Sequence, residues 1–139
     1  MTTTLNGQII GQAERTTRAV LDRFLDRTGT DFLGWVALNV IATGNQATES
    51  SVVSQLAQGL RVDESVARST VDGLVARGLL EGDVELSAAG RQRHDQIRQG
   101  IAEITARLYG DLPGDELEVA ARVLTTITAR AQAELSTPA

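Results

Sequence analysis

The spacing of apolar residues along almost the whole chain is the feature that most constrains its fold. Apolar residues recur three and four positions apart over long stretches, and only two prolines interrupt a chain of 139 residues. This period is typical of helices that bury one face. The pattern therefore predicts a mainly α-helical protein, with helices over residues 8–28, 31–43, 51–60, 64–78, 88–109 and 115–135.

Turn and capping residues mark the boundaries between these helices. The stretch "LLEGDVEL" predicts a very short β-hairpin, in which Gly82 and Asp83 form a two-residue turn. A short polar side chain just before a helix can accept from the free amides of its first turn, and a glycine at its end can adopt the left-handed conformation. The predicted N-caps are Asp31, Asp63 and Ser87, and the predicted left-handed glycines are Gly44, Gly78 and Gly110.

Residues 51–78, "SVVSQLAQGLRVDESVARSTVDGLVARG", predict a helix-turn-helix. The first helix carries apolar residues, the turn "LRVD" has apolar anchors and an acidic cap, and a second helix follows. A helix-turn-helix offers the first half of its second helix to the major groove, where short hydroxyls and arginine suit base edges and phosphates. On the second helix the expected inward residues are Ala67, Thr70, Val71 and Leu74, and the expected outward residues are Ser65, Arg68, Ser69 and Asp72.

At these residues the chain resembles the MarR (multiple antibiotic resistance regulator) family of winged-helix transcription factors. The resemblance runs through "SQLAQGLRVDESVARSTVDGLVARGLLE", resumes at "LSAAGR", and includes "GDLPGDELEVAARVLTTI", so that it covers roughly residues 8–135. It implies a winged helix-turn-helix with a very short wing over about 31–86. It also implies dimerisation helices over about 8–28 and 88–135, within one domain spanning 1–139, and a small-molecule pocket between the two regions.

The apolar surface of the outermost helices independently predicts a homodimer. The segments 8–28 and 115–135 carry more apolar side chains than one small lobe can cover. These residues are Ile9, Ile10, Val20, Leu21, Val119, Val123, Leu124 and Ile127.

The wing departs from the pattern of the family it resembles. Family members usually carry an aspartate and one or more arginines near the wing tip, where arginine enters the minor groove, but here Glu81 and Glu85 flank the tip. Residues 51–90 hold three arginines against six acids, a net charge of −3. Either the arginines, including the downstream Arg91 and Arg93, gather at the groove while the acids turn away, or DNA binding is weak. The candidate DNA-binding residues are Arg61, Ser65, Arg68, Ser69, Arg77 and Arg91.

The aromatic residues and the single histidine are the candidates for a ligand site. Phe24, Phe32 and Trp35 are expected to be core, or to line an apolar pocket in which Trp35 stacks on an aromatic or phenolic effector. His94 is expected on a solvated face, or in an anion site with the arginines beside it, which would lower its pKa. The candidate ligand-binding residues are Phe24, Phe32, Trp35 and His94.

Composition excludes several other classes of function. A net charge of −5 does not suit a nonspecific nucleic-acid binder, the absence of cysteine excludes disulfides and thiolate metal sites, and one histidine cannot build a multi-histidine site. No residue pattern indicates a nucleophile with its base, so we expect no enzyme, no catalytic or metal-binding residues and no cofactor. Neither a secretory signal nor a spanning segment is evident, which predicts a cytoplasmic protein without membrane contact.

Two functions remain open. The first is a ligand-responsive regulator of transcription, a homodimer on a pseudo-palindromic operator in double-stranded DNA, whose effector stabilises a dimer with wrongly spaced recognition helices and so relieves repression. The second is a MarR-like module that binds a small molecule or a protein, with weak or lost DNA binding because its wing is truncated and acidic. The outward hydroxyls and arginine of the second helix favour the first function, and the charge of the wing favours the second.

Overall fold

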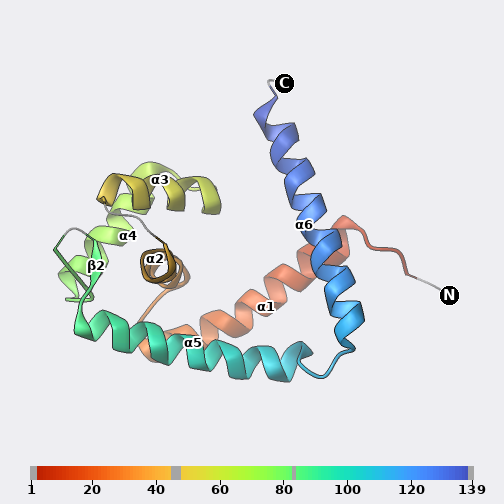
Figure 1. Ribbon diagram of the computed structural model, residues 1–139, viewed down its shortest axis with the longest axis horizontal. Coiled ribbons are helices and arrows are strands. Elements are labelled where there is room, and N and C mark those ends of the chain that lie inside the picture. Colours follow the sequence, from red (N-terminus) through yellow and green to blue (C-terminus); the bar gives the residue numbers. More distant parts are fainter. Residues whose placement is uncertain (1–2, 45–47, 83, 138–139) are drawn as a thin grey trace. The chain divides into compact units, whose positions relative to one another are not determined.

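The computed structural model describes residues 3–44, 48–82 and 84–137. Two compact units, Met1–Glu103 and Ile104–Ala139, divide the chain and are described separately. The described residues form six helices and one antiparallel hairpin, which confirms the mainly α-helical prediction (Figure 1). In chain order the elements are α1 (Gly7–Thr28), α2 (Phe32–Thr43), α3 (Glu49–Leu60), α4 (Glu64–Ala76), β1 (Leu80–Glu81), β2 (Glu85–Leu86), α5 (Ala88–Tyr109) and α6 (Gly114–Ser136).

The core of the first unit lies where α2, α3, α4 and the hairpin meet. Figure 1 shows α2 beside α3, α4 and β2, in agreement with the contacts among these elements. Helices α3 and α4 bury the faces that the three-and-four spacing predicts. Leu38 of α2, Val53 and Leu56 of α3, and Val71 and Leu74 of α4 all have exposed fractions of 2% or less.

Side-chain caps fix two of the three predicted helix starts. The Asp31 carboxylate accepts from the Gly34 amide at 2.7 Å, and the Ser87 hydroxyl accepts from the Gly90 amide at 3.0 Å. Asp63 occupies the N-cap position of α4, but its side chain makes no capping hydrogen bond, so that prediction is wrong in its chemistry.

Among the predicted left-handed glycines, only Gly78 adopts that conformation, with φ of 77°. Gly44 has φ of −94°, and Gly110 is not among the glycines with positive φ in the described chain. A glycine that the sequence did not single out, Gly29, ends α1 with φ of 73°.

The hairpin has three residues between its strands, not the predicted two. Leu80 pairs with Leu86 and Glu81 with Glu85, which leaves residues 82–84 as the connection. Pairing the two buried leucines on one face sets this register, since a shift by one residue would place a leucine opposite a glutamate. Val84, the last of the three, is buried and has φ of 52°.

Helix α5 starts from a close contact with the chain leading into the hairpin. The Ser87 hydroxyl donates to the Gly78 carbonyl at 2.6 Å, and the Ser87 amide donates to the Leu79 carbonyl at 3.0 Å. A Cβ on Gly90 would lie closer than 3.0 Å to that Leu79 oxygen. The serine and glycine of "LSAAGR" are therefore both dictated by the way α5 meets residues 78–79.

The second unit contains the end of α5 and α6. Helix α6 begins with the acidic residues Asp115 and Glu116 in its first turn, where carboxylates are favourable, and none of its residues is buried within the single chain. Its exposed apolar residues include Val119, Val123, Leu124 and Ile127. None of the helices in the described ranges combines the length and the apolar character that crossing a membrane requires.

Candidate nucleic-acid interface

Helix α4 has one buried face and one polar, exposed face. Ala67, Val71 and Leu74 are buried as predicted. Thr70 is only half-buried, and its hydroxyl donates back to the Val66 carbonyl at 2.9 Å. The buried residues hold α4 against α2 and α3, so the opposite face is presented by a rigid support.

The predicted outward residues of α4 are all exposed. Ser65, Arg68, Ser69 and Asp72 lie on the side away from the core. Two hydroxyls and a guanidinium spaced along about one turn can donate to phosphates or to base edges in a major groove. This face is the candidate nucleic-acid interface, and the helix-turn-helix prediction that led to it is confirmed in its fold.

The turn between α3 and α4 places an arginine in a position that usually favours glycine. Arg61 ends α3 in the left-handed conformation, with φ of 57° and ψ of 45°, and its amide donates to the Ala57 carbonyl. A non-glycine residue pays about 1–2 kcal/mol in this region. The exposed Arg61 side chain thereby brings a positive charge to the turn that precedes α4.

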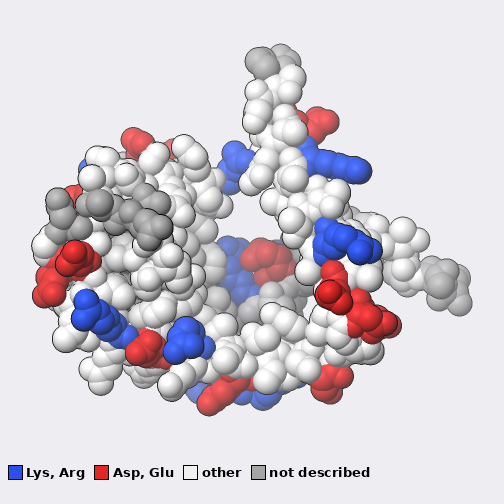
Figure 2. Space-filling model, viewed as in Figure 1, with Lys and Arg blue, Asp and Glu red and all other residues white. Residues whose placement is uncertain are grey.

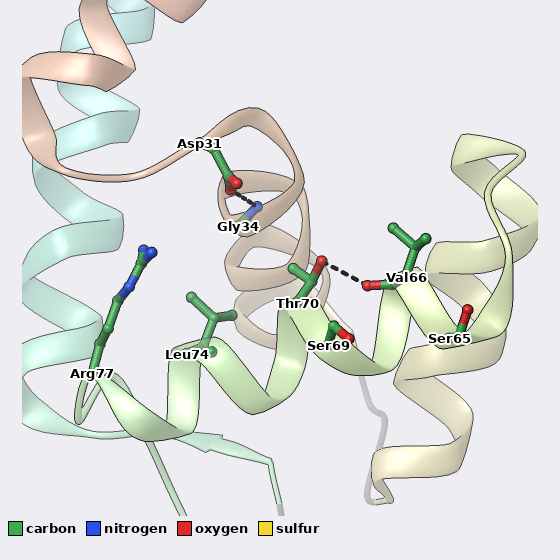
Figure 3. A pocket seen from close by; sticks show the side chains of 9 residues that line it. Asp31, Gly34, Ser65, Val66, Ser69, Thr70, Leu74 and Arg77 are labelled. Atoms are coloured by element: carbon green, nitrogen blue, oxygen red, sulfur yellow. Dashed lines mark hydrogen bonds between the residues drawn. The ribbon is translucent and has the colours of Figure 1, made fainter.

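Hydroxyl groups of α4 and the Arg77 side chain line a depression of about 380 Å³ against the start of α2. Figure 3 shows Ser65 toward one end of α4 and Arg77 at the other, with Asp31, which caps α2, and Gly34 of α2 across from α4. Arg77 Nη1 donates to the Gly29 carbonyl at 3.3 Å, so this guanidinium is turned toward the α1–α2 connection.

The remaining candidate arginines lie outside this depression, and each has a different setting. Arg68 Nη1 is 3.8 Å from Glu49 Oε1, an acid in the first turn of α3. Arg91 lies in the first turn of α5 and is exposed. The six candidate DNA-binding residues are thus all exposed, but the structure groups only Ser65, Ser69 and Arg77 around one hollow.

Acidic residues accompany these arginines. Figure 2 shows basic and acidic side chains interspersed over the face in view. Glu64 begins α4, and Glu81 and Glu85 of the hairpin are exposed and directly paired across the two strands. The expected turn residue Asp83 lies outside the described residues. Glu49, which lies outside residues 51–90, also stands beside Arg68 at the candidate interface.

His94 is buried, so the expectation of a solvated histidine is wrong. Its exposed fraction is 9%, its ring stacks on Trp35 with centroids 5.3 Å apart, and its Nε2 lies 3.1 Å from the amide oxygen of Asn39. Burial is the main cause that lowers the His94 pKa below 6.5; the neighbouring Asp95 raises it and Arg98 adds to the lowering. The periodicity of α5 did not reveal this, because Trp35 and Asn39 reach His94 from α2.

The three arginines near His94 do not form a common anion site. Arg93 Nη1 donates to the Thr30 hydroxyl at 2.8 Å, while Arg98 lies 3.9 Å from Asp95. Arg91 is exposed at the start of the same helix. Arg93 and Arg98 therefore have different partners, neither of which is shared with Arg91.

The other candidate ligand residues occupy separate places in the first unit. Three ring carbons of Phe24 lie where a Cβ on Gly100 would be, so the ring packs directly on α5. The Arg18 guanidinium lies over the Phe32 ring, with Arg18 Cζ 5.6 Å from the ring centroid. Phe32 also lines a second depression of about 350 Å³. That depression also has three aspartates, Asp22, Asp26 and Asp31, in its lining. Of the four predicted ligand residues, Trp35 and His94 are the pair in direct contact.

Solved structures share this fold, although the sequence matches no protein-family model and no curated protein. The transcriptional regulator PA3341 is 22% identical, with a TM-score of 0.78 over 91% of this chain and 97% of its own. CouR from Rhodococcus jostii, bound to p-coumaroyl-CoA, is 17% identical, with a TM-score of 0.74 over 87% of this chain and 90% of its own. The Mycobacterium tuberculosis MarR family protein Rv2887 in complex with DNA is 16% identical, with a TM-score of 0.73 over 90% of this chain and 98% of its own. The same protein in complex with salicylic acid gives a TM-score of 0.67. The chain has the winged-helix fold of the MarR regulators.

Proposed function

We propose that this protein is a MarR-type transcriptional regulator, which binds an operator in double-stranded DNA as a homodimer and responds to a small-molecule effector. The observation that carries the proposal is the exposed face of α4, where Ser65, Arg68 and Ser69 stand above the buried Ala67 and Val71. Rv2887, which has the same fold, is crystallised with DNA. A helix held in this way can enter a major groove and contact base edges with its first half.

The proposal is tested by selecting bound fragments from genomic DNA at low and moderate salt, followed by variants of α4. Arg68→Ala should weaken binding to the selected site at least about 30-fold, because a base contact contributes about 1–3 kcal/mol and a symmetric dimer loses two. Arg23→Ala, which removes the same charge from an exposed position on α1, is the matched control. A native-like protein that prefers no sequence would overturn the proposal.

The homodimer is proposed from the apolar residues that α6 exposes. Val119, Val123, Leu124 and Ile127 recur at helical spacing and have exposed fractions of 37–46%. In a soluble protein such a contiguous face is expected to be covered by another surface, and a second copy of the chain supplies one of equal character. We propose one domain over 1–139, with the DNA-binding lobe over 31–86 and dimerisation helices over 8–28 and 88–135.

The effector is proposed to bind beside Trp35 and His94, and Phe24 and Phe32 remain the other two proposed ligand-binding residues. This stacked pair offers aromatic surface, and the Asn39 amide supplies a polar group. Rv2887 is crystallised with salicylic acid, and CouR with p-coumaroyl-CoA, which suggests aromatic acids as probes. Salicylate should quench the fluorescence of Trp35, the single tryptophan, over the range in which it releases DNA. Release of DNA without a change in Trp35 emission would instead favour the depression beside α4.

A second candidate function is a MarR-like module that binds a small molecule or a protein but not DNA. The paired, exposed Glu81 and Glu85 of the hairpin favour it, because they would repel phosphates at the position where a wing approaches DNA. Tight effector binding by a native dimer that selects no DNA fragment would establish this alternative.

A further inference from the structure

The ion pair between Glu49 and Arg68 joins two helices at the candidate nucleic-acid interface. Glu49 Oε1 and Arg68 Nη1 are 3.8 Å apart, with the glutamate in the first turn of α3 and the arginine in α4. The other ion pairs of the described residues lie within α1 or within α5. Glu49 is thus the acid that the fold places against the arginine on the exposed face of α4.

Stability does not explain this arrangement. The two side chains are 43% and 50% exposed, and their atoms are near the limit of an ion pair. Exposed pairs of this kind contribute little to folding, because water and salt screen them and two long side chains must be held in place. The effect of Glu49 therefore has to be sought in what Arg68 contacts when DNA is present.

A carboxylate beside Arg68 affects its two possible DNA contacts differently. The phosphate groups are negatively charged, so Glu49 repels them at distances within the screening length of about 8–10 Å. The O6 and N7 acceptors of guanine are uncharged, and Arg68 can donate to them while another of its five donors faces Glu49. Glu49 consequently penalises phosphate contacts more than base contacts.

We propose that Glu49 is a specificity-determining residue of the DNA-binding face. By pairing with Arg68 it suppresses the contacts that this arginine would otherwise make to the phosphates of any duplex, and it leaves contacts to the operator bases available. The inference rests on the proposed function and adds a reason for the acidic character of the lobe. It requires only the residues of α3 and α4 and the distance between them.

The test is Glu49→Gln, compared with Glu116→Gln as a matched control. Both glutamates lie in the first turn of a helix, so both variants lose the same charge from the same favourable position. Of these two glutamates, only Glu49 lies within 4.0 Å of a described arginine. Dissociation constants are measured for the selected operator and for a scrambled duplex of equal length at several salt concentrations. Thermal unfolding of each variant confirms the native fold.

Glu49→Gln should tighten binding to the scrambled duplex by on the order of tenfold, tighten operator binding less, and steepen the salt slope on the scrambled duplex by about one unit per lobe. Glu116→Gln, which lies outside α3 and α4, should leave the ratio of the two affinities unchanged. In an Arg68→Ala background Glu49→Gln should no longer alter that ratio.

Two results would overturn the inference alone. One is a wild-type protein that prefers its operator while Glu49→Gln keeps the same preference. The other is a loss of operator affinity with unchanged binding to the scrambled duplex, which would mean that Glu49 itself accepts from a base. A chain that prefers no duplex would overturn the proposed function and this inference together, so the failures are distinguishable.

Discussion

The contact between Gly90 and the Leu79 carbonyl makes a sharp prediction about stability. A Cβ at position 90 would approach this oxygen more closely than 3.0 Å, and the carbonyl carbon lies at 3.0 Å. The obstacle is backbone, and the Ser87 amide already holds that oxygen at 3.0 Å. Gly90→Ala therefore has to push the first turn of α5 away from residues 78–79, and the bonds of Ser87 are strained at the same time.

The expected cost follows from these contacts. Overpacking a tight site costs about 1–3 kcal/mol, and weakening the Ser87 hydrogen bonds adds about 0.5–1.5 kcal/mol for each bond lost, so we expect Gly90→Ala to destabilise the protein by about 2–4 kcal/mol. With a slope near 2 kcal/mol per molar, the urea midpoint should fall by about 1–2 M. Unfolding is followed by circular dichroism at one fixed protein concentration, because the stability of the proposed homodimer would depend on concentration.

The matched control for this prediction is Gly59→Ala, which is expected to stabilise the protein instead of destabilising it. A Cβ on Gly59, within α3, meets nothing within 4 Å, and the residue does not have a positive φ. Replacing a helical glycine by alanine under these conditions should stabilise the protein by about 0.4–1 kcal/mol. If both variants unfold at the midpoint of the wild type, the close approach of α5 to Leu79 has no energetic weight and the reasoning is wrong.

Three further variants test other parts of the structure. Gly100→Ala should lower stability by about 1–3 kcal/mol, because its Cβ would overlap the Phe24 ring; an unchanged urea midpoint would show that the ring moves freely. Burial lowers the His94 pKa, so its contribution to stability is present above pH 6.5 and is lost as pH falls through the folded-state pKa. His94→Gln should therefore lose less stability than the wild type between pH 7.5 and 5.5, and equal losses would contradict this. Ile127→Asp should raise the dimer dissociation constant by at least about tenfold in light scattering, since it places a charge on the apolar face of α6. Glu134→Asp on the same helix, which keeps its charge, is the control.

The local sequence pattern was sufficient to predict the helices and to tell the buried face of α4 from its exposed face. The buried residues of α4 recur at the helical period; they are Ala67, Val71 and Leu74. This period alone identifies the face that packs on a neighbouring element, whichever element that is. The cap at Asp31 was predictable for the same reason, because it depends on a residue only three positions away.

Features that depend on distant residues were not predictable from this one sequence. His94 is buried because Trp35 and Asn39 of α2 reach it, 55 or more positions away, and the charged residues beside it in α5 gave no sign of this. The pairing of Glu49 with Arg68 likewise depends on how α3 packs against α4. The hairpin register followed from the burial of Leu80 and Leu86 together, which a search for favoured turn residues did not consider.

The acidic hairpin and the Glu49–Arg68 pair lead to the same physical conclusion. Glu81 and Glu85 face each other across the strands, where like charges already repel, and an approaching phosphate would add to that repulsion. For a regulator of the proposed kind, these acids weaken binding to every duplex, whereas the hydroxyls and arginine of α4 strengthen binding only where the bases match. Occupancy of an operator in a genome depends on the ratio of specific to nonspecific affinity. A lobe with few cations can therefore act selectively, provided that its acids weaken nonspecific binding more than they weaken binding to the operator.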